Sequence, residues 1–125
     1  MIYSGIDLVD SRRIKKALEN NPQSFYERIC TKSEINFLKE HKRKEEKLAG
    51  IFALKEAFSK ALGTGIGENF GFHDLEVSYL PSGQPKIKYV GVRFSSVKNS
   101  WQISCSISHE GPMLVAVVVL LGEVS

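Results

Sequence analysis

The first part of the chain alternates between short apolar segments and polar breaks. Residues Met1–Val9 are rich in β-formers and carry Asp7 near their end, so the pattern predicts an opening strand. A helix over 12–20 is expected to follow, with Ser11 as its N-cap and Asn20-Asn21-Pro22 as its end.

Two shorter helices are predicted next. The first covers 24–30. The second begins at Thr31, because Thr31-Lys32-Ser33-Glu34 has the capping-box pattern, in which the first and fourth side chains each bond the other's backbone. This helix runs through Phe37 and Leu38. Residues 39–47 are almost wholly charged, which is typical of a solvated turn or helix face.

The strongest helical signal lies between Glu45 and Leu62. Apolar residues recur there with the spacing of one helix face, at Leu48, Ile51, Phe52, Phe58, Ala61 and Leu62. A second stripe, made of Ala49, Ala53 and Ala57, would let another backbone approach closely. Gly63 and Gly65 are expected to end the helix.

Beyond residue 70 the pattern becomes that of β-structure. Alternation predicts a strand over 74–80, a turn over 81–85 and a return strand over 86–90, whereas 91–99 fits neither type. Residues 101–108 alternate again, and the continuous apolar run 113–121 is typical of a strand buried on both faces. A strand, then helices, then a β-rich half predicts a single α+β domain over 1–125.

The composition supports a globular domain and narrows its partners. Of the 125 residues, 42% are hydrophobic and 25% are charged, as in an ordinary folded domain. The net charge is +3, and residues 1–62 hold 13 Lys and Arg against 9 Asp and Glu, most densely at Arg12, Arg13, Lys15 and Lys16. This mild excess favours an acidic partner or a phosphate ligand over a nucleic-acid coat.

Cysteine usage and hydropathy indicate the compartment. Cys30 and Cys105 are far apart and lack Cys-x-x-Cys or Cys/His spacing, which argues against zinc and against a disulfide framework. Asp7 and Asp10 interrupt the only apolar stretch near the N-terminus, so no signal peptide is predicted. The run 113–121 is too short for a membrane span, which needs about 20 residues. We expect a cytoplasmic protein with no membrane partner.

Three charged side chains are the leading candidates for chemistry. Asp7 interrupts an apolar strand, where a carboxylate must be exposed at the strand end, paired or bound to a cation. Glu56 and Lys60 are four residues apart on the long helix and share a face with Phe52. Taken alone, they are a surface ion pair. Beside an apolar stripe and ahead of a glycine-rich turn, they also suit a phosphate ester bound through Mg²⁺.

Two further motifs carry weaker signals. Gly63-Thr64-Gly65-Ile66-Gly67 follows a helix, so it lacks the strand–loop–helix order of nucleotide-binding loops, and a helix stop explains it. Ser106-Ile107-Ser108-His109 leaves a strand, but the chain has no Gly-x-Ser-x-Gly elbow, which argues against a serine hydrolase. His109 is therefore either a structural hydrogen-bonding group or a phosphate partner.

Taken together, these segments resemble the holo-acyl-carrier-protein synthase family, the short phosphopantetheinyl transferases. The matching motifs, in family order over nearly the whole chain, are Gly5-Ile6-Asp7-Leu8-Val9-Asp10, Arg13-Ile14, Thr31-x-Ser33-Glu34, Leu48 through Gly65, Gly83-x-Pro85 and Ser106-Ile107-Ser108-His109. The resemblance implies the α+β phosphopantetheinyl transferase fold, in which an antiparallel-rich sheet packs against one long helix and several short helices.

The resemblance also implies a reaction. Enzymes of this family move the 4′-phosphopantetheine arm of coenzyme A (CoA) to a serine of apo acyl carrier protein, for fatty acid biosynthesis, and release adenosine 3′,5′-bisphosphate. By motif match, Asp7, Glu56 and Lys60 would be catalytic: Asp7 and Glu56 would hold Mg²⁺, and Lys60 would meet the phosphates. CoA contacts would come from Gly63, Gly83, Pro85, Ser108 and His109, with Lys44 or Lys47 in addition.

Three details of the family comparison concern the carrier, CoA and the base. Arg13 matches a family arginine that contacts the acidic carrier, and Arg12, Lys15 and Lys16 either extend that patch or form a solvated face. Ile51 stands where the family usually has an arginine that approaches CoA. The base for the carrier's serine is open between a metal-bound water and Glu56, and Glu34 is a weaker candidate because capping explains it.

Chain length bears on assembly, and two other functions stay open. Longer phosphopantetheinyl transferases contain two copies of this unit with the site between them, and the resemblance to the short family implies a homotrimer with three interfacial sites.

One alternative function is that of a Mg²⁺-dependent phosphohydrolase that uses Asp7 and Glu56 on another ester. The other is a small RNA-binding module, but the charge excess is small and not interleaved with aromatic residues, so no nucleic-acid partner is expected.

Overall fold

The computed structural model describes residues 1–122, except for the side chains of Ser95, Lys98 and Asn99. Its elements are β1 (Ile2–Asp10), α1 (Ser11–Asn20), α2 (Pro22–Ile29), α3 (Lys32–Lys39), α4 (Lys44–Leu62), the 3₁₀ turn η1 (Phe72–Asp74), β2 (Leu75–Tyr79), β3 (Pro85–Tyr89), α5 (Ser95–Ser100), β4 (Gln102–Glu110) and β5 (Met113–Leu121). Strands β1, β5 and β4 form an antiparallel sheet in that order, and β2 pairs with β3 in a separate hairpin. The expected α+β architecture is confirmed.

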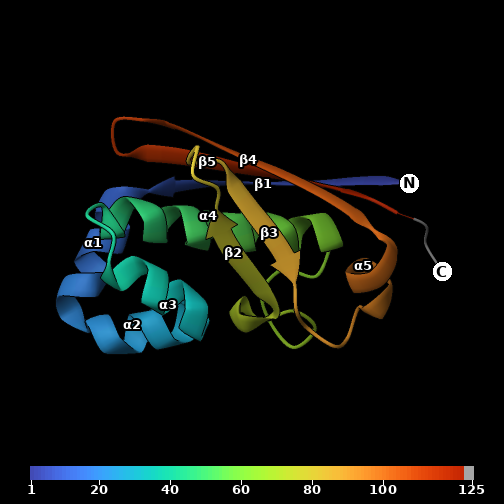
Figure 1. Cartoon of the computed structure of the whole chain (residues 1–125), viewed down its shortest axis with the longest axis horizontal. Coiled ribbons are helices and arrows are strands. Elements are labelled where there is room, and N and C mark those ends of the chain that lie inside the picture. The colour runs from blue at the N-terminus through green and yellow to red at the C-terminus, as the bar shows by residue number, and fades with distance from the viewer. Residues whose placement is uncertain (123–125) are drawn as a thin grey trace.

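Helix α4 is the central element of the molecule (Figure 1). The three-stranded sheet lies along one side of it, α2 and α3 lie on the opposite side, and the β2–β3 hairpin crosses it. Of its 19 residues, 11 are buried. The helix is therefore enclosed on several sides and forms the core to which the other elements attach.

Glycine at position 5 allows α4 to approach β1 closely. A Cβ atom there would clash with the carbonyl oxygen of Ala57 and lie 2.6 Å from the amide nitrogen of Ala61. The predicted stripe of alanines therefore does admit another backbone, and that backbone is the opening strand. This contact sets the spacing between β1, which carries Asp7, and α4, which carries Glu56.

The helix ends follow local capping rules, with one correction. The prediction that Ser11 caps α1 is wrong: α1 begins at Ser11, and the carboxylate of Asp10 accepts a hydrogen bond from the backbone N–H of Arg12 at 3.0 Å. Aspartate is as good an N-cap as serine, so the earlier of two adjacent candidates starts the helix. The predicted capping box between Thr31 and Glu34 is confirmed.

The β-rich half contains two differences from the prediction. Residues 91–99, which fit neither type, include most of α5. Strand β5 is not buried on both faces. Its even-numbered residues, such as Leu114 and Val118, are buried against α4, whereas Val119 and Leu121 on the other face are exposed. A continuous apolar run here marks the central strand of an antiparallel sheet that the chain covers on one side.

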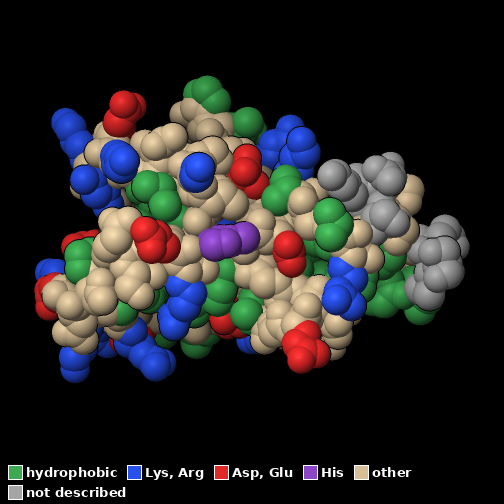
Figure 2. Space-filling model, turned by 90° about the horizontal axis from the view of Figure 1, so that it is seen from below, with side chains coloured by type: hydrophobic (Ala, Val, Ile, Leu, Met, Phe, Trp, Pro, Cys, Tyr) green, Lys and Arg blue, Asp and Glu red, His purple; other side chains and the backbone are tan. Residues whose placement is uncertain are grey.

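The uncovered side, hereafter the open sheet face, is strongly apolar. Its exposed apolar side chains come from β1 and β5 and are Ile2, Ile6, Leu8, Val119 and Leu121, and the three on β1 are 60–71% exposed. The side of the molecule away from the sheet is different, because Figure 2 shows basic and acidic side chains spread over it with only small hydrophobic areas between them. No helix within residues 1–122 is both long and apolar enough to cross a membrane.

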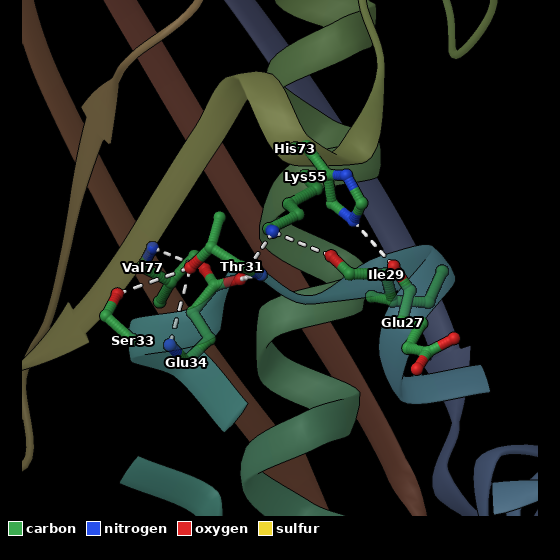
Figure 3. A network of polar contacts seen from close by, with 8 residues as sticks. All are labelled: Glu27, Ile29, Thr31, Ser33, Glu34, Lys55, His73 and Val77. Atoms are coloured by element: carbon green, nitrogen blue, oxygen red, sulfur yellow. Dashed lines mark hydrogen bonds and ion pairs between the residues drawn. The ribbon is translucent and has the colours of Figure 1, made fainter. Parts of the chain in front are cut away.

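A buried ion pair joins α4 to three other elements (Figure 3). The ammonium of Lys55 donates to Oε1 of Glu34 on α3 at 2.6 Å and to the carbonyl oxygen of Ile29 at the end of α2 at 2.7 Å. Oε2 of Glu34 accepts from the backbone N–H of Val77 on β2 at 2.6 Å. Both charged side chains are fully buried. Burial lowers the pKa of Lys55, and the charge of Glu34 opposes that effect.

We expect Lys55→Met to lower the free energy of unfolding by about 3–5 kcal/mol, because it leaves the Glu34 carboxylate buried without a cation. The double variant Lys55→Met/Glu34→Gln removes both charges and should lose less stability than the single variant. Urea unfolding followed by circular dichroism measures both effects, with Lys32→Met as a control at an exposed lysine. A double variant less stable than Lys55→Met would contradict this account.

Candidate active site

Asp7 lies on β1 and is paired with a lysine of α4. Its side chain is 14% exposed, and the ammonium of Lys60 donates to its Oδ1 at 3.1 Å. Lys60 also donates to the carbonyl oxygen of Ile6 at 3.0 Å. In the described part of the chain, Lys60 therefore pairs with Asp7 and not with Glu56. The surface pair between Glu56 and Lys60, one of the two interpretations of that helix face, is not formed.

Asp7 and Glu56 line the same cavity. It has a volume of about 440 Å³ and lies between β1, α1, α2 and α4, with Arg13, Arg28 and Phe52 also in its wall. The pKa of Glu56 is raised, chiefly by burial and secondly by the negative charge of Asp7, while Lys60 acts in the opposite direction. The two acids, 49 positions apart in the sequence (56 minus 7), are therefore close enough to affect each other's charge.

This pair of carboxylates fits a hard divalent cation. The charge of Asp7 disfavours ionisation of Glu56, and a cation near both would remove that repulsion. Mg²⁺ commonly takes one or two carboxylates together with phosphate oxygens and waters. Within residues 1–122 no cluster of three or more His, Cys, Asp or Glu side chains is placed to hold a metal. Any ion here would therefore need ligands from a substrate or from water.

A second cavity collects other predicted residues at the opposite edge of the sheet. His109, near the end of β4, lines a space of about 210 Å³ together with Gly83 and Pro85 of the hairpin. Glu46 and Lys47 from the beginning of α4 complete this wall. Oε1 of Glu46 lies 3.6 Å from Nε2 of His109, a distance at which a protonated imidazole forms an ion pair.

A single chain does not bring the two cavities together. Strands β1 and β4 are the two edges of the sheet, with β5 between them. Asp7 is opposite Ala116 of β5, and Ala116 is opposite Ile107 of β4, so the central strand separates Asp7 from His109. Of the residues that the resemblance assigns to one CoA molecule, one protomer thus holds two separate groups, which are Asp7, Glu56 and Lys60, and Gly83, Pro85 and His109.

Four other residues considered from the sequence lie outside these two groups. Ser108 projects to the open sheet face, because neighbouring residues of a strand alternate in direction, and so points away from His109. Lys44 lines a different cavity, between α2 and α3. Gly63 ends α4 in the left-handed conformation, with φ of +83°, and lines neither cavity. Ile51 is fully buried.

The basic residues of α1 and α2 differ in whether a carboxylate already binds them and in whether they line the cavity of Asp7 and Glu56. The guanidinium of Arg12 makes a two-pronged contact with Asp10, at 2.7 and 3.0 Å, so its charge is partly neutralised. Arg13 instead lines the cavity of Asp7 and Glu56. Arg28 of α2 lines it too, and its guanidinium lies 5.7 Å from the ring centre of Phe25. Sequence reasoning missed Arg28, since nothing in its local pattern places α2 beside β1.

Comparison with known proteins gives a consistent result over the whole chain. The sequence model of the 4′-phosphopantetheinyl transferase superfamily matches residues 4–118. The holo-(acyl-carrier-protein) synthase of Ligilactobacillus salivarius is 45% identical over 124 residues, which are 96% of this chain and 87% of that protein. The enzyme of the same name from Aliarcobacter butzleri is 40% identical over 118 residues, covering 92% and 93% of the two chains.

Solved structures agree with the sequence matches. The Helicobacter pylori holo-(acyl-carrier-protein) synthase in complex with coenzyme A has a TM-score of 0.80 and 40% identity, covering 96% of this chain and 99% of that one. The Bacillus anthracis holo-(acyl-carrier-protein) synthase in complex with CoA (3′,5′-ADP) has a TM-score of 0.81 and 38% identity, covering 97% and 96%.

We expect Glu56 to hold its proton to a higher pH than an ordinary glutamate, because burial and the charge of Asp7 both oppose ionisation. Asp7→Asn should lower the pKa of Glu56. Lys60→Met should raise it, since the ammonium favours the ionised form. Carboxyl ¹³C NMR titration in metal-free buffer measures these shifts, with exposed Glu19 as internal reference. An unchanged pKa of Glu56 in both variants would refute the coupling of the three groups.

Proposed function

This chain belongs to the 4′-phosphopantetheinyl transferase superfamily, and we infer that it transfers 4′-phosphopantetheine from CoA to a serine of apo acyl carrier protein. The products are holo acyl carrier protein and adenosine 3′,5′-bisphosphate. The observation that carries this conclusion is the match to holo-(acyl-carrier-protein) synthases at up to 45% identity over nearly the whole chain. The placement of Asp7 and Glu56 in one cavity supports it.

We propose that Asp7 and Glu56 hold Mg²⁺ when CoA is bound. The ion would neutralise the pyrophosphate of CoA and polarise the phosphoryl group that is transferred. Lys60 already lies on Asp7, and its exposed ammonium supplies positive charge for the departing adenosine bisphosphate. Charge neutralisation and positioning account for most of the catalysis of phosphoryl transfer, and these side chains would supply both.

Glu56 is the proposed acceptor of the proton from the carrier's serine. As the serine oxygen bonds to the pantetheine phosphorus, the bond from that phosphorus to the bridging oxygen breaks, and the hydroxyl proton passes to Glu56. Glu56 lines the cavity beside Asp7, so its carboxylate lies in the site that the serine would enter. Glu34 is unsuited to this role because it is fully buried against Lys55 and lines neither cavity.

The proposed carrier-binding surface is centred on Arg13. Arg13 and Arg28 line the Asp7 cavity, and neither has a carboxylate partner within 4.0 Å in the part of the chain that the structure describes. Lys16 and Lys15 are exposed on the same helix as Arg13. Arg12 is a weaker contributor, because Asp10 already binds it. An acidic carrier would meet this surface as its serine enters the cavity.

We propose that the active unit is a homotrimer with sites between protomers. Asp7 and His109 lie at opposite edges of the sheet, so one CoA reaches both kinds of residue only if the β4 edge of one protomer adjoins the β1 edge of another. The open sheet face is apolar enough to be covered on assembly. We also propose a cytoplasmic location, where a reducing environment would keep Cys30 and Cys105 as free thiols.

Intact-mass spectrometry of apo acyl carrier protein, incubated with CoA and Mg²⁺, tests the function. We expect the wild type to add one phosphopantetheine group to the carrier. Glu56→Gln should reduce labelling by at least about 100-fold, because a metal ligand and proton acceptor is lost. Glu19→Gln, an exposed change on α1 that keeps the fold, serves as control. An unmodified carrier together with phosphate released from simple esters would favour a phosphohydrolase.

Subunit mixing tests the assembly. Asp7→Asn and His109→Ala proteins should each be poorly active, whereas equal amounts unfolded and refolded together should regain about a quarter of the wild-type rate, since a quarter of random interfaces pair an intact Asp7 with an intact His109. Light scattering of both variants checks that the assembly is kept. A mixture no more active than its components would contradict a site shared between protomers.

A further inference from the structure

The last turn of α2 is completed by donors from outside the helix. The last carbonyl groups of a helix have no partner within it. In α2, the carbonyl oxygen of Ile29 accepts from the ammonium of Lys55, and the carbonyl oxygen of Glu27 accepts from Nε2 of His73 at 2.6 Å (Figure 3). A carbonyl oxygen can only accept, so Nε2 carries the proton in this contact. His73, 46 positions from Glu27 in the sequence, therefore caps the end of α2.

His73 projects from a turn that is itself fixed, the 3₁₀ turn η1. The carbonyl oxygen of Asp74 accepts from the N–H of Val90 at 2.8 Å, which attaches η1 to the residue that follows β3. On the other side of His73, the ring of Phe72 stacks on Phe52 of α4 with 5.7 Å between ring centres. The imidazole therefore starts from a fixed backbone and can hold in place the group that it binds.

The end of α2 forms part of the wall of the cavity of Asp7 and Glu56. Arg28 lies between the two bonded carbonyl groups in the sequence, and it lines this cavity together with Phe25, which is one turn earlier. A shift or unwinding of the last turn would therefore move the guanidinium of Arg28 relative to the cavity. His73 is exposed and does not line the cavity, so it can affect the cavity only through the helix that it caps.

The contact between His73 and α2 is separate from the ion pairs that stabilise the fold. Within residues 1–122, no carboxylate lies within 4.0 Å of the imidazole of His73. Removal of His73 therefore leaves no buried charge without a partner, in contrast to removal of Lys55. An exposed hydrogen bond adds little to the free energy of unfolding, so variants of His73 should remain folded.

We propose that His73 is a positioning residue for the transfer reaction. By binding the carbonyl oxygen of Glu27 it holds the last turn of α2, and so keeps Arg28 in the wall that the incoming acidic carrier meets. This assignment rests on the proposed function. The residues proposed to hold Mg²⁺ and meet the phosphates of CoA lie on β1 and α4, not on α2. Loss of the His73 contact should therefore weaken the use of the carrier and leave the use of CoA unchanged.

Steady-state transfer assays on His73→Leu test the assignment. We expect the KM for apo acyl carrier protein to rise about threefold, the effect of weakening one partly exposed charge contact, while kcat and the KM for CoA stay within about twofold of wild type. His73→Gln should restore the carrier KM, because its amide N–H can donate to the same carbonyl oxygen. Gln23→Leu is the matched control and should leave the carrier KM unchanged, since it removes a 2.7 Å hydrogen bond to the Glu27 side chain within α2, and Gln23 does not line the cavity.

A double-mutant cycle with Arg28 tells whether His73 acts through that residue. Arg28→Ala alone should raise the KM for the carrier. Adding His73→Leu to Arg28→Ala should raise this KM by less than about 1.5-fold further, because the contact that His73 positions is already lost. The same fold-change for His73→Leu in both backgrounds would overturn the assignment.

The remaining outcomes separate this assignment from the transfer reaction itself. An unchanged carrier KM in His73→Leu would overturn the role of His73. So would a lower kcat with a rise of both KM values and early thermal unfolding, which is the result expected of a merely structural residue. A wild type that transfers nothing would refute the transfer reaction. Calorimetry with the apo carrier then decides the role of His73, which holds only if His73→Leu binds the carrier about threefold more weakly than the wild type and His73→Gln binds it equally well.

Discussion

The close contact between Gly5 and Ala57 is the constraint on which the proposed active site depends. Asp7 is two residues from Gly5 on the same side of β1, and Glu56 is the neighbour of Ala57 on α4. Because the two backbones meet with no side chain between them at this point, both carboxylates reach one cavity. A methyl group at position 5 would push strand and helix apart. Packing at this contact thus offsets the burial of Glu56 and its repulsion from Asp7, which together raise the pKa of Glu56.

The opposite side of α4 is fixed by charge. Lys55, immediately before Glu56, points into the protein and binds Glu34 and the end of α2. Lys60, one turn further along, points the other way to Asp7. Inward anchoring through Lys55 therefore determines the rotation of the helix about its axis, and with it the direction in which Glu56 and Lys60 project. Within residues 55–60 of α4, Lys55 therefore has a structural role, whereas Glu56 and Lys60 have the proposed chemical roles.

Local interactions explain which parts of the fold the sequence could predict. The apolar periodicity of α4 and the capping box at Thr31 depend on residues within a few positions of each other, and both predictions are confirmed. The cap of α1 is wrong because Asp10 and Ser11 are adjacent and equally suitable. The burial of β5 is wrong because a continuous apolar run does not tell which face the same chain covers. That distinction depends on strand order.

The arrangement of the candidate site was harder to predict from the sequence, because it too depends on contacts between residues that are far apart in the chain. The sequence indicates Asp7, Glu56 and Lys60 by residue type and position, but the pairing of Lys60 with Asp7 spans 53 positions and requires the packing of α4 on β1. The separation of His109 from Asp7 follows only from the central placement of β5. The hydrogen bond from His73 to the carbonyl oxygen of Glu27 joins η1 to a helix that no local pattern brings beside it.

Helix α4 has few positions that are free to vary. Eleven of its 19 residues are enclosed, and several of the others, among them Glu56 and Lys60, carry the proposed chemistry. Exposed Glu45, which lines neither cavity, is one of the few positions of this helix where substitutions should be tolerated. An inhibitor seated against the later turns would meet a surface on which most escape substitutions unfold the protein or disable it, so resistance there would carry a fitness penalty.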